Sequence, residues 1–347
     1  MNASSKMLPM LRHELVSNFP RAVSSRSFGS DKAKPPNGIP ENNTSPSYTE
    51  VEVPVPWGHI SGKWWGSQDQ IPIIALHGFE DNAGTYDRLA PLLDVPAIFA
   101  WDAPGHGRSS HMPVGHTYHF ADFLISLRLL IRRFGWEKVS LMGHSWGSAT
   151  ALMYSALFPE SVEHYVSIDC ARTLMPLTGV LGVPRTRKII NHMIKYDNIV
   201  SNNLDPPAYN MQQVQEMIVQ GTFQSVTPEN CEPLIKRGTL PHPKVPDKVY
   251  FSRDLRLRVG DACRPTVSLA TQAAGKVRCH VLSILAKQGF VAAIGDDVER
   301  VYRHQEGLMQ QGAASFRTFN VKGSHHLHLN TPERVAPLIN EFFSQTQ

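Results

Sequence analysis

The chain has 347 residues, of which 41% are hydrophobic, so it is long enough to bury a large core and has an ordinary globular composition. Its net charge of +4 comes from residues 1–40, where six basic residues stand against two acidic ones, and the rest of the chain is balanced. We therefore predict no nucleic-acid partner. An integral membrane span needs an apolar stretch of about 18 residues, and no stretch of this sequence approaches that length.

Residues 1–47 are predicted to be an extension outside the folded body. A short helix over 7–19 would place Leu11, Leu15 and Phe19 on one face, and the stretch that follows is rich in Arg and Ser and poor in acids. This composition is typical of a mitochondrial transit peptide, whereas the prolines and one early glutamate favour a disordered extension. The first interpretation predicts a mitochondrial protein, and the second predicts a cytoplasmic or peroxisomal one.

From residue 48 onward, strand and helix patterns alternate. Short apolar runs between turn residues predict eight strands, at residues 48–56, 59–65, 71–76, 97–101, 138–142, 162–168, 279–285 and 315–321. The clearest helix follows Thr117 and ends at Gly135, a glycine in the position of a C-terminal cap. This alternation predicts an α/β protein with a mainly parallel eight-stranded sheet, helices on both faces, and ligands at the carboxyl ends of the strands.

Residues 171–268 interrupt the alternation. The stretch is rich in Pro, Met and Asn, shows helical patterns over 186–194 and 210–220, and carries no strand pattern. Because it is too long for a loop, we predict a helical lid or cap inserted between the two parts of the core, 48–170 and 269–347.

The cysteines show neither the spacing of a metal site nor that of a disulfide scaffold. There are four of them, Cys170, Cys231, Cys263 and Cys279. We expect free thiols in a reducing compartment and no metal site.

The pentapeptide Gly143-His-Ser145-Trp-Gly147 lies between a predicted strand and a predicted helix. In such a nucleophile elbow, the serine adopts a strained backbone conformation at a sharp turn, which exposes its hydroxyl above the sheet. A β-carbon at either glycine would clash with neighbouring backbone. Serine is a weak nucleophile unless a base removes its proton, and the adjacent His325 and His326 are candidates for that base.

Four separated motifs resemble those of the α/β-hydrolase fold, and they occur in the same order. They are His77-Gly-Phe79, Asp102-Ala-Pro-Gly-His-Gly-Arg-Ser109, the Gly143–Gly147 pentapeptide and His325-His-Leu-His328. The stretches from Leu76 to Leu89 and Phe251-Ser-Arg-Asp254 look closer still to the serine hydrolase-like proteins, the kraken-like subgroup. The similarity covers about residues 48–345.

The resemblance implies roles for residues at the matching positions. Ser145 takes the place of the nucleophile and His325 that of the base, with His326 as the alternative. The backbone N–H groups of Phe79 and Trp146 would form the oxyanion hole. The turn that begins at Asp102 is interpreted as structural, without a part in the chemistry.

The acid that completes the triad departs from the commonest family pattern. Many relatives carry it after the seventh predicted strand, where this chain has Gly289. Some relatives place it after the sixth strand, where this chain has Asp169, which we therefore favour. Asp296 and Asp297 are the alternatives, although both also suit the first turn of a helix.

These features predict a serine hydrolase of the carboxylic ester hydrolase type, which cleaves an ester, thioester or related acyl bond of an apolar small molecule through an acyl-enzyme on Ser145. No phosphate-binding glycine loop is present, so we predict no cofactor. Serine at the elbow argues against epoxide hydrolases and haloalkane dehalogenases, while carbon–carbon bond hydrolysis and perhydrolysis stay compatible. The alternative is a ligand-binding protein that has kept the fold and lost activity, which the missing acid at Gly289 favours.

Overall fold

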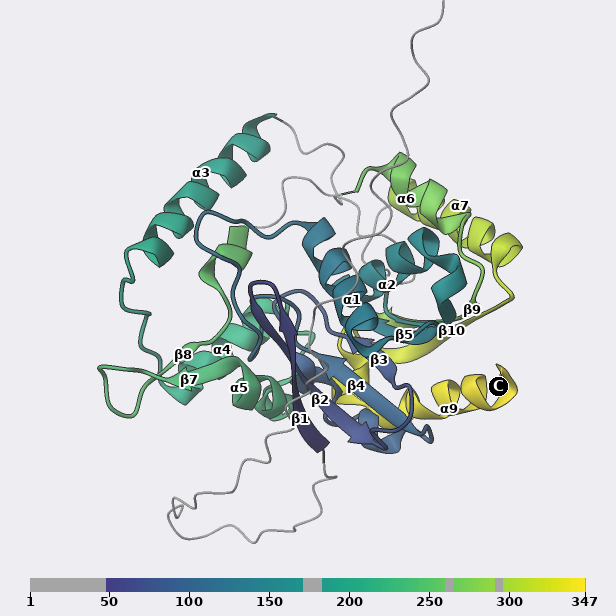
Figure 1. The fold of residues 1–347 in the computed structure, drawn as a ribbon, viewed down its shortest axis with the longest axis horizontal. Coiled ribbons are helices and arrows are strands. Elements are labelled where there is room, and N and C mark those ends of the chain that lie inside the picture. The colour runs from purple at the N-terminus through teal and green to yellow at the C-terminus, as the bar shows by residue number, and fades with distance from the viewer. Residues whose placement is uncertain (1–47, 171–182, 260–264, 291–295, 347) are drawn as a thin grey trace, which may run out of the picture.

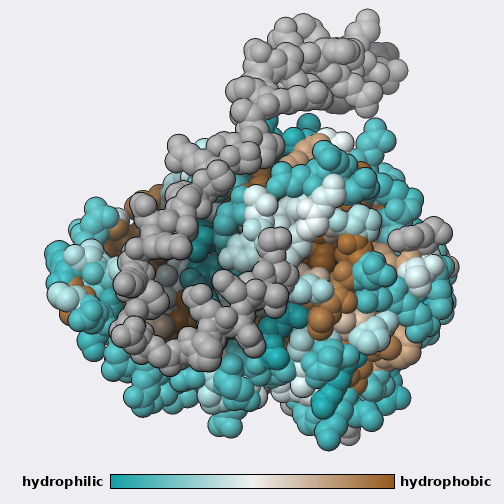
Figure 2. Space-filling model, turned by 90° about the horizontal axis from the view of Figure 1, so that it is seen from below, coloured by the Kyte–Doolittle hydropathy of each residue, from teal (hydrophilic) through white to brown (hydrophobic). Residues whose placement is uncertain are grey.

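The computed structural model describes residues 48–170, 183–259, 265–290 and 296–346 (Figure 1). The predicted extension at residues 1–47, with its targeting interpretation, lies outside the described residues. Among those residues, no helix combines the length and the apolar character that crossing a bilayer requires. The face shown in Figure 2 is largely hydrophilic, and its largest apolar area lies to the right of the centre.

An eight-stranded sheet organises the fold, in the order β1-β2-β4-β3-β5-β6-β9-β10. The strands are β1 (Tyr48–Val55), β2 (Gly58–Gly66), β3 (Ile73–Leu76), β4 (Ala97–Trp101), β5 (Val139–His144), β6 (Val162–Ile168), β9 (His280–Gln288) and β10 (Ser315–Ser324). β1 and β4 each pair antiparallel with β2, and all other neighbours are parallel. The predicted sheet and its eight strands are confirmed. β9 and β10 run about three residues further than predicted, because their pairing resumes after a bulge, with Ser324 opposite Gln288.

Helices cover both faces of the sheet (Figure 1). One face carries α1 (Phe120–Phe134), α2 (Trp146–Leu157), α6 (Val267–Ala274) and α7 (Asp296–Gly312), and the other carries α9 (Ala336–Thr346). Along β3, Ile74 belongs to the core under the first set of helices, whereas Ile73 and Ala75 belong to the core under α9. This alternation follows from the two-residue period of a strand, and it makes the central strands apolar on both faces.

The clearest predicted helix, α1, begins and ends as its sequence indicates. At its start, the His119 N–H donates to the Asp122 carboxylate over 2.7 Å. At its end, Gly135 adopts a left-handed conformation with φ of 71°. This conformation favours glycine at a helix C-terminus, so the predicted cap is confirmed.

Between β6 and β9 the chain leaves the sheet. This segment includes α3 (Val183–Ser201), α4 (Met211–Gly221), α5 (Glu232–Gly238) and an antiparallel pair, β7 (Thr239–Pro241) and β8 (Val249–Phe251). The expectation that it lacks strands is wrong at β7 and β8, which at three residues each are too short to show a two-residue period. A small core around Val214, Val226 and Leu234 holds the segment together. That residues 171–268 form a lid separate from the sheet-containing core stays a prediction.

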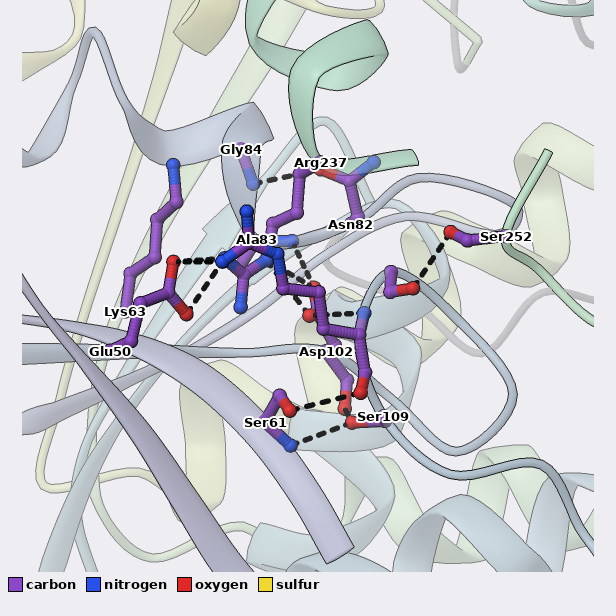
Figure 3. Close-up of polar contacts among 12 residues, drawn as sticks. Glu50, Ser61, Lys63, Asn82, Ala83, Gly84, Asp102, Ser109, Arg237 and Ser252 are labelled. Atoms are coloured by element: carbon purple, nitrogen blue, oxygen red, sulfur yellow. Dashed lines mark hydrogen bonds and ion pairs between the residues drawn. The ribbon is translucent and has the colours of Figure 1, made fainter. Parts of the chain in front are cut away.

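A buried ion pair joins α5 to the sheet (Figure 3). Arg237 donates from Nε to both carboxylate oxygens of Asp102, at 2.9 and 2.8 Å, and from a terminal nitrogen to Glu50 on β1. The Asp102 carboxylate also accepts the backbone N–H groups of Ala83 and Arg108. The turn after β4 is therefore an anchor for the inserted segment, which accords with the structural role expected for it.

Candidate active site

Ser145 occupies the sharp turn between β5 and α2. Its backbone angles, φ 51° and ψ −117°, are strained for a residue with a side chain. A β-carbon at Gly143 would lie 2.5 Å from Ser148 Cα, and one at Gly147 would lie 2.6 Å from the His77 carbonyl oxygen. Both elbow glycines therefore have a steric cause, and Ser145 stays partly exposed between buried neighbours.

His325 lies directly after β10 and contacts Asp169, which lies directly after β6. Its Nδ1 is 2.6 Å from Asp169 Oδ2, with the carboxylate fully buried and 17% of the histidine side chain exposed. The carboxylate also accepts the backbone N–H groups of Ala286, at 2.8 Å, and Phe290, at 3.0 Å. A carboxylate held at Nδ1 favours the tautomer with its proton there, which leaves the Nε2 lone pair to act as a base.

Gly289 explains why the acid follows β6 instead of β9. A β-carbon at this glycine would clash with both carboxylate oxygens of Asp169. A side chain at Gly289 and the observed position of the Asp169 carboxylate therefore exclude each other. The alternatives, Asp296 and Asp297, begin α7, and their side chains fall outside the described part of the chain.

Two contacts bring the elbow to this histidine–aspartate pair. The Ser145 N–H donates to the carbonyl oxygen of Ile168 over 3.1 Å, and Ile168 immediately precedes Asp169. On the other side of the serine, His144 donates from Nε2 to the His325 carbonyl oxygen over 3.0 Å, and the two rings are 4.6 Å apart. The carboxyl ends of β5, β6 and β10 thus gather Ser145, Asp169 and His325 at one edge of the sheet.

The two predicted oxyanion-hole segments also meet at this edge. Trp146 is the first residue of α2, so its backbone N–H belongs to the helix turn whose donors have no acceptor within the helix. Phe79 follows β3 across Gly78, and its ring lies 5.6 Å from the Trp146 ring. The side chain of Trp146 is buried against Phe120 and Phe123, so it packs the core beside the nucleophile.

His326, the alternative base, contacts different partners from those of His325. Its Nε2 lies 3.2 Å from Asp81 Oδ2, and its Nδ1 lies 2.7 Å from Ser225 Oγ. Only 4% of the residue is exposed. The structure therefore assigns the contact with Asp169 to His325, as the family pattern implied.

A buried cluster around His326 was not predicted from the sequence. It consists of Asp81, His144, His326 and His328, whose imidazole rings lie 4.1 to 5.9 Å apart. Burial lowers the pKa of His144 to about 3 and also lowers that of His328. Burial alone would raise the pKa of Asp81, but the neighbouring histidines hold it well below its usual range. His144, His326 and His328 lie within the four fold motifs and Asp81 lies in the stretch from Leu76 to Leu89, but no sequence pattern shows that their side chains converge.

Comparisons with known proteins agree with this arrangement. Residues 71–183 match the family model of the alpha/beta hydrolase fold. A Drosophila melanogaster protein named probable serine hydrolase is 36% identical over 301 residues, which cover 86% of this chain and 88% of the fly protein. Human serine hydrolase-like protein 2 is 30% identical over 319 residues, which cover 88% of this chain and 97% of the human one.

A solved structure shows the same architecture. It is a hypothetical protein from Pseudomonas aeruginosa, which matches with a TM-score of 0.71 and 29% identity and covers 85% of this chain and 99% of its own. The fold, the order of the motifs and these relatives lead to one conclusion. The chain belongs to the serine hydrolase-like proteins of the α/β-hydrolase fold.

Proposed function

We propose that the protein hydrolyses an ester, thioester or related acyl bond through an acyl-enzyme on Ser145. The observation that carries this proposal is the 2.6 Å contact between His325 Nδ1 and the buried Asp169 carboxylate, next to a strained serine elbow. Membership of the serine hydrolase-like proteins supports the hydrolase class.

The first half of the reaction forms the acyl-enzyme. Ser145 Oγ attacks the carbonyl carbon of the substrate while His325 Nε2 accepts the hydroxyl proton. The oxyanion that develops accepts hydrogen bonds from the backbone N–H groups of Phe79 and Trp146. The imidazolium, stabilised by Asp169, then gives its proton to the leaving group as the bond to that group breaks.

The second half releases the acid. His325 Nε2 takes a proton from water, and the resulting hydroxide equivalent attacks the acyl carbon. The tetrahedral intermediate collapses and Ser145 Oγ recovers its proton from the imidazolium. The two backbone N–H bonds that Asp169 accepts hold its carboxylate in place through both halves, so the histidine keeps one orientation.

Aromatic side chains beside the reacting groups support an apolar substrate. The Phe290 ring lies 5.8 Å from the His325 ring. Phe79, next to the proposed oxyanion hole, keeps 37% of its surface exposed and so offers apolar surface to a substrate there. An acyl chain or an apolar leaving group suits these surroundings.

A fluorophosphonate probe tests the proposal and separates it from the inactive ligand-binding alternative. We expect the probe to add to one site per chain, with the modified peptide containing Ser145, and we expect Ser145→Ala to abolish labelling. Ser344→Ala, which removes an exposed hydroxyl on α9, is the matched control and should label normally. A well-folded wild-type chain that does not react would support the alternative.

A further inference from the structure

Three buried side chains that the proposed mechanism does not use meet at one point. Asp81 Oδ2 lies 3.2 Å from His326 Nε2 and 3.7 Å from His144 Nδ1, and the three atoms all lie within 4.8 Å of one another. The residues are 6%, 4% and 0% exposed, respectively. Groups buried this deeply need partners that match their protonation states.

Hydrogen bonds define the protonation of His144. Its Nε2 faces the His325 carbonyl oxygen, which can only accept, so Nε2 carries the proton. A proton on Nδ1 as well would have no acceptor within hydrogen-bond distance in the described part of the chain, and the position is buried, so the ring is neutral. His144 Nδ1 is therefore a lone pair, and it has no hydrogen-bond partner among the residues that the structure describes.

The same reasoning applies to His326. Ser225 Oγ donates its one proton to the Thr222 carbonyl oxygen over 2.6 Å, so towards His326 Nδ1 it acts as an acceptor. The Nδ1 of His326 therefore carries a proton, and its Nε2, which lies 3.2 Å from Asp81 Oδ2, has room for one cation, a second proton or a metal ion. When His326 Nε2 gives up that proton, two imidazole lone pairs and a carboxylate face one another, and a metal cation between them makes the arrangement favourable.

We propose that Asp81, His144 and His326 form a binding site for a divalent transition metal ion of the zinc type. Two neutral imidazoles and one carboxylate are a donor set that such ions prefer, with a fourth position open to water. Each histidine donates its other N–H to an oxygen, the His325 carbonyl or Ser225 Oγ. This arrangement orients metal-binding imidazoles and fixes their tautomers.

Gly78 leaves room beside the cluster. A β-carbon at this position would lie 2.9 Å from His144 Nδ1 and 3.1 Å from Asp81 Oδ2. The space next to both donor atoms is therefore clear of a side chain. Metal–ligand bonds of about 2.0–2.2 Å place tetrahedral ligands about 3.3 Å apart, close to the two distances from Asp81 Oδ2. Binding requires a small contraction of the cluster, whose three donor atoms lie within 4.8 Å of one another.

A bound ion would lie beside the proposed catalytic base. His144 is hydrogen-bonded to the His325 backbone, and the His325 ring lies 4.6 Å from the His144 ring and 5.3 Å from the His326 ring. A nearby dication disfavours the imidazolium that His325 forms during the reaction, so the ion should inhibit turnover. This effect rests on the proposed function, whereas binding of the ion does not.

Titration of the full-length chain with zinc or cobalt tests the site. After removal of metals with a chelator, we expect one ion per chain by calorimetry and the visible spectrum of four-coordinate cobalt. Asp81→Asn and His326→Gln should each weaken binding at least about tenfold. His325→Ala should bind the metal ion as tightly as the wild type, which would exclude the His325–Asp169 pair as the metal site. His116→Gln, at an exposed histidine beside Asp122, is the matched control for surface binding.

Histidine ring signals in ¹⁵N nuclear magnetic resonance provide a second measurement, which does not depend on the folding of any variant. Zinc should shift two rings of the wild-type chain, one bound through Nδ1 and the other through Nε2. The proposal is overturned if the chain binds no stoichiometric metal, if folded Asp81→Asn and His326→Gln bind as the wild type does, or if only other histidines shift. A proton on His326 Nε2 would then be the charge that holds the cluster together.

Discussion

At the scale of single residues, the position of the Asp169 carboxylate depends on the absence of a side chain at Gly289. The carboxylate that contacts His325 occupies the space that a side chain at residue 289 would need. From the sequence, Asp169 could be proposed only because it follows a predicted strand at a position that some relatives use. The clash at Gly289 could not be predicted, because it depends on how the loops after β6 and β9 pack against each other.

An aspartate introduced at residue 289, where many relatives carry the acid, tests whether the two positions exclude each other. Gly289→Asp alone should clash with Asp169, place two carboxylates together and reduce both stability and the proposed hydrolytic activity. Adding Asp169→Gly removes the clash, and φ of 50° at residue 169 suits glycine. We expect the double variant to exceed Asp169→Gly in kcat/KM by at least about tenfold, because a carboxylate again orients His325. If the double variant and Asp169→Gly had equal kcat/KM, an acid at residue 289 could not replace the acid at residue 169.

At the scale of secondary-structure elements, the strands were predictable and the inserted segment was less so. The strands of the central sheet are continuous apolar runs, such as Ile73–Leu76 and Ala97–Trp101, because both faces are buried. β7 and β8 were missed because their pairing depends on contacts between short segments. The cluster of Asp81, His144 and His326 was missed for a related reason, since three separate elements supply it.

The buried pair of Arg237 on α5 with Asp102 after β4 makes the attachment of the inserted segment testable. Burial alone would raise the pKa of Asp102, but the charge and hydrogen bonds of Arg237 lower it. Arg237→Leu leaves this carboxylate buried without its cation, which should cost about 3–5 kcal/mol in the free energy of unfolding. Chemical denaturation measures the loss.

The neighbouring Lys236 is the matched control. It pairs with Glu232 one helical turn away, and both side chains are mostly exposed. Lys236→Leu should therefore change the free energy of unfolding by no more than about 0.5 kcal/mol. Similar losses in the Arg237 and Lys236 variants would refute the anchoring role of the buried pair.

At the scale of the whole molecule, the edge of the sheet that carries the site is also where buried histidines collect. Four of them have lowered pKa values, chiefly because burial disfavours the charged ring, and they are His77, His106, His144 and His328. In the folded protein these rings therefore take up a proton only at a lower pH, and the pKa of His106 and of His144 is about 3.

This difference predicts a loss of stability in acid. Below about pH 6.5 the unfolded chain binds protons at these histidines while the folded chain does not, so the free energy of unfolding falls as the pH falls. Each such histidine contributes a slope of at most about 1.4 kcal/mol per pH unit. Melting temperatures measured from pH 8 to pH 4 should decline steadily below pH 6.5. A constant or rising melting temperature across that interval would contradict neutral buried rings.

If Ser145, His325 and Asp169 act together in acyl transfer, the turnover of Asp169→Asn on an activated ester should reveal it. We predict that kcat falls by about 10⁴-fold, because the amide favours the wrong histidine tautomer and cannot stabilise the imidazolium. The variant should remain folded by circular dichroism and should retain substrate binding. A folded Asp169→Asn protein with the wild-type kcat would show that Asp169 has no part in catalysis.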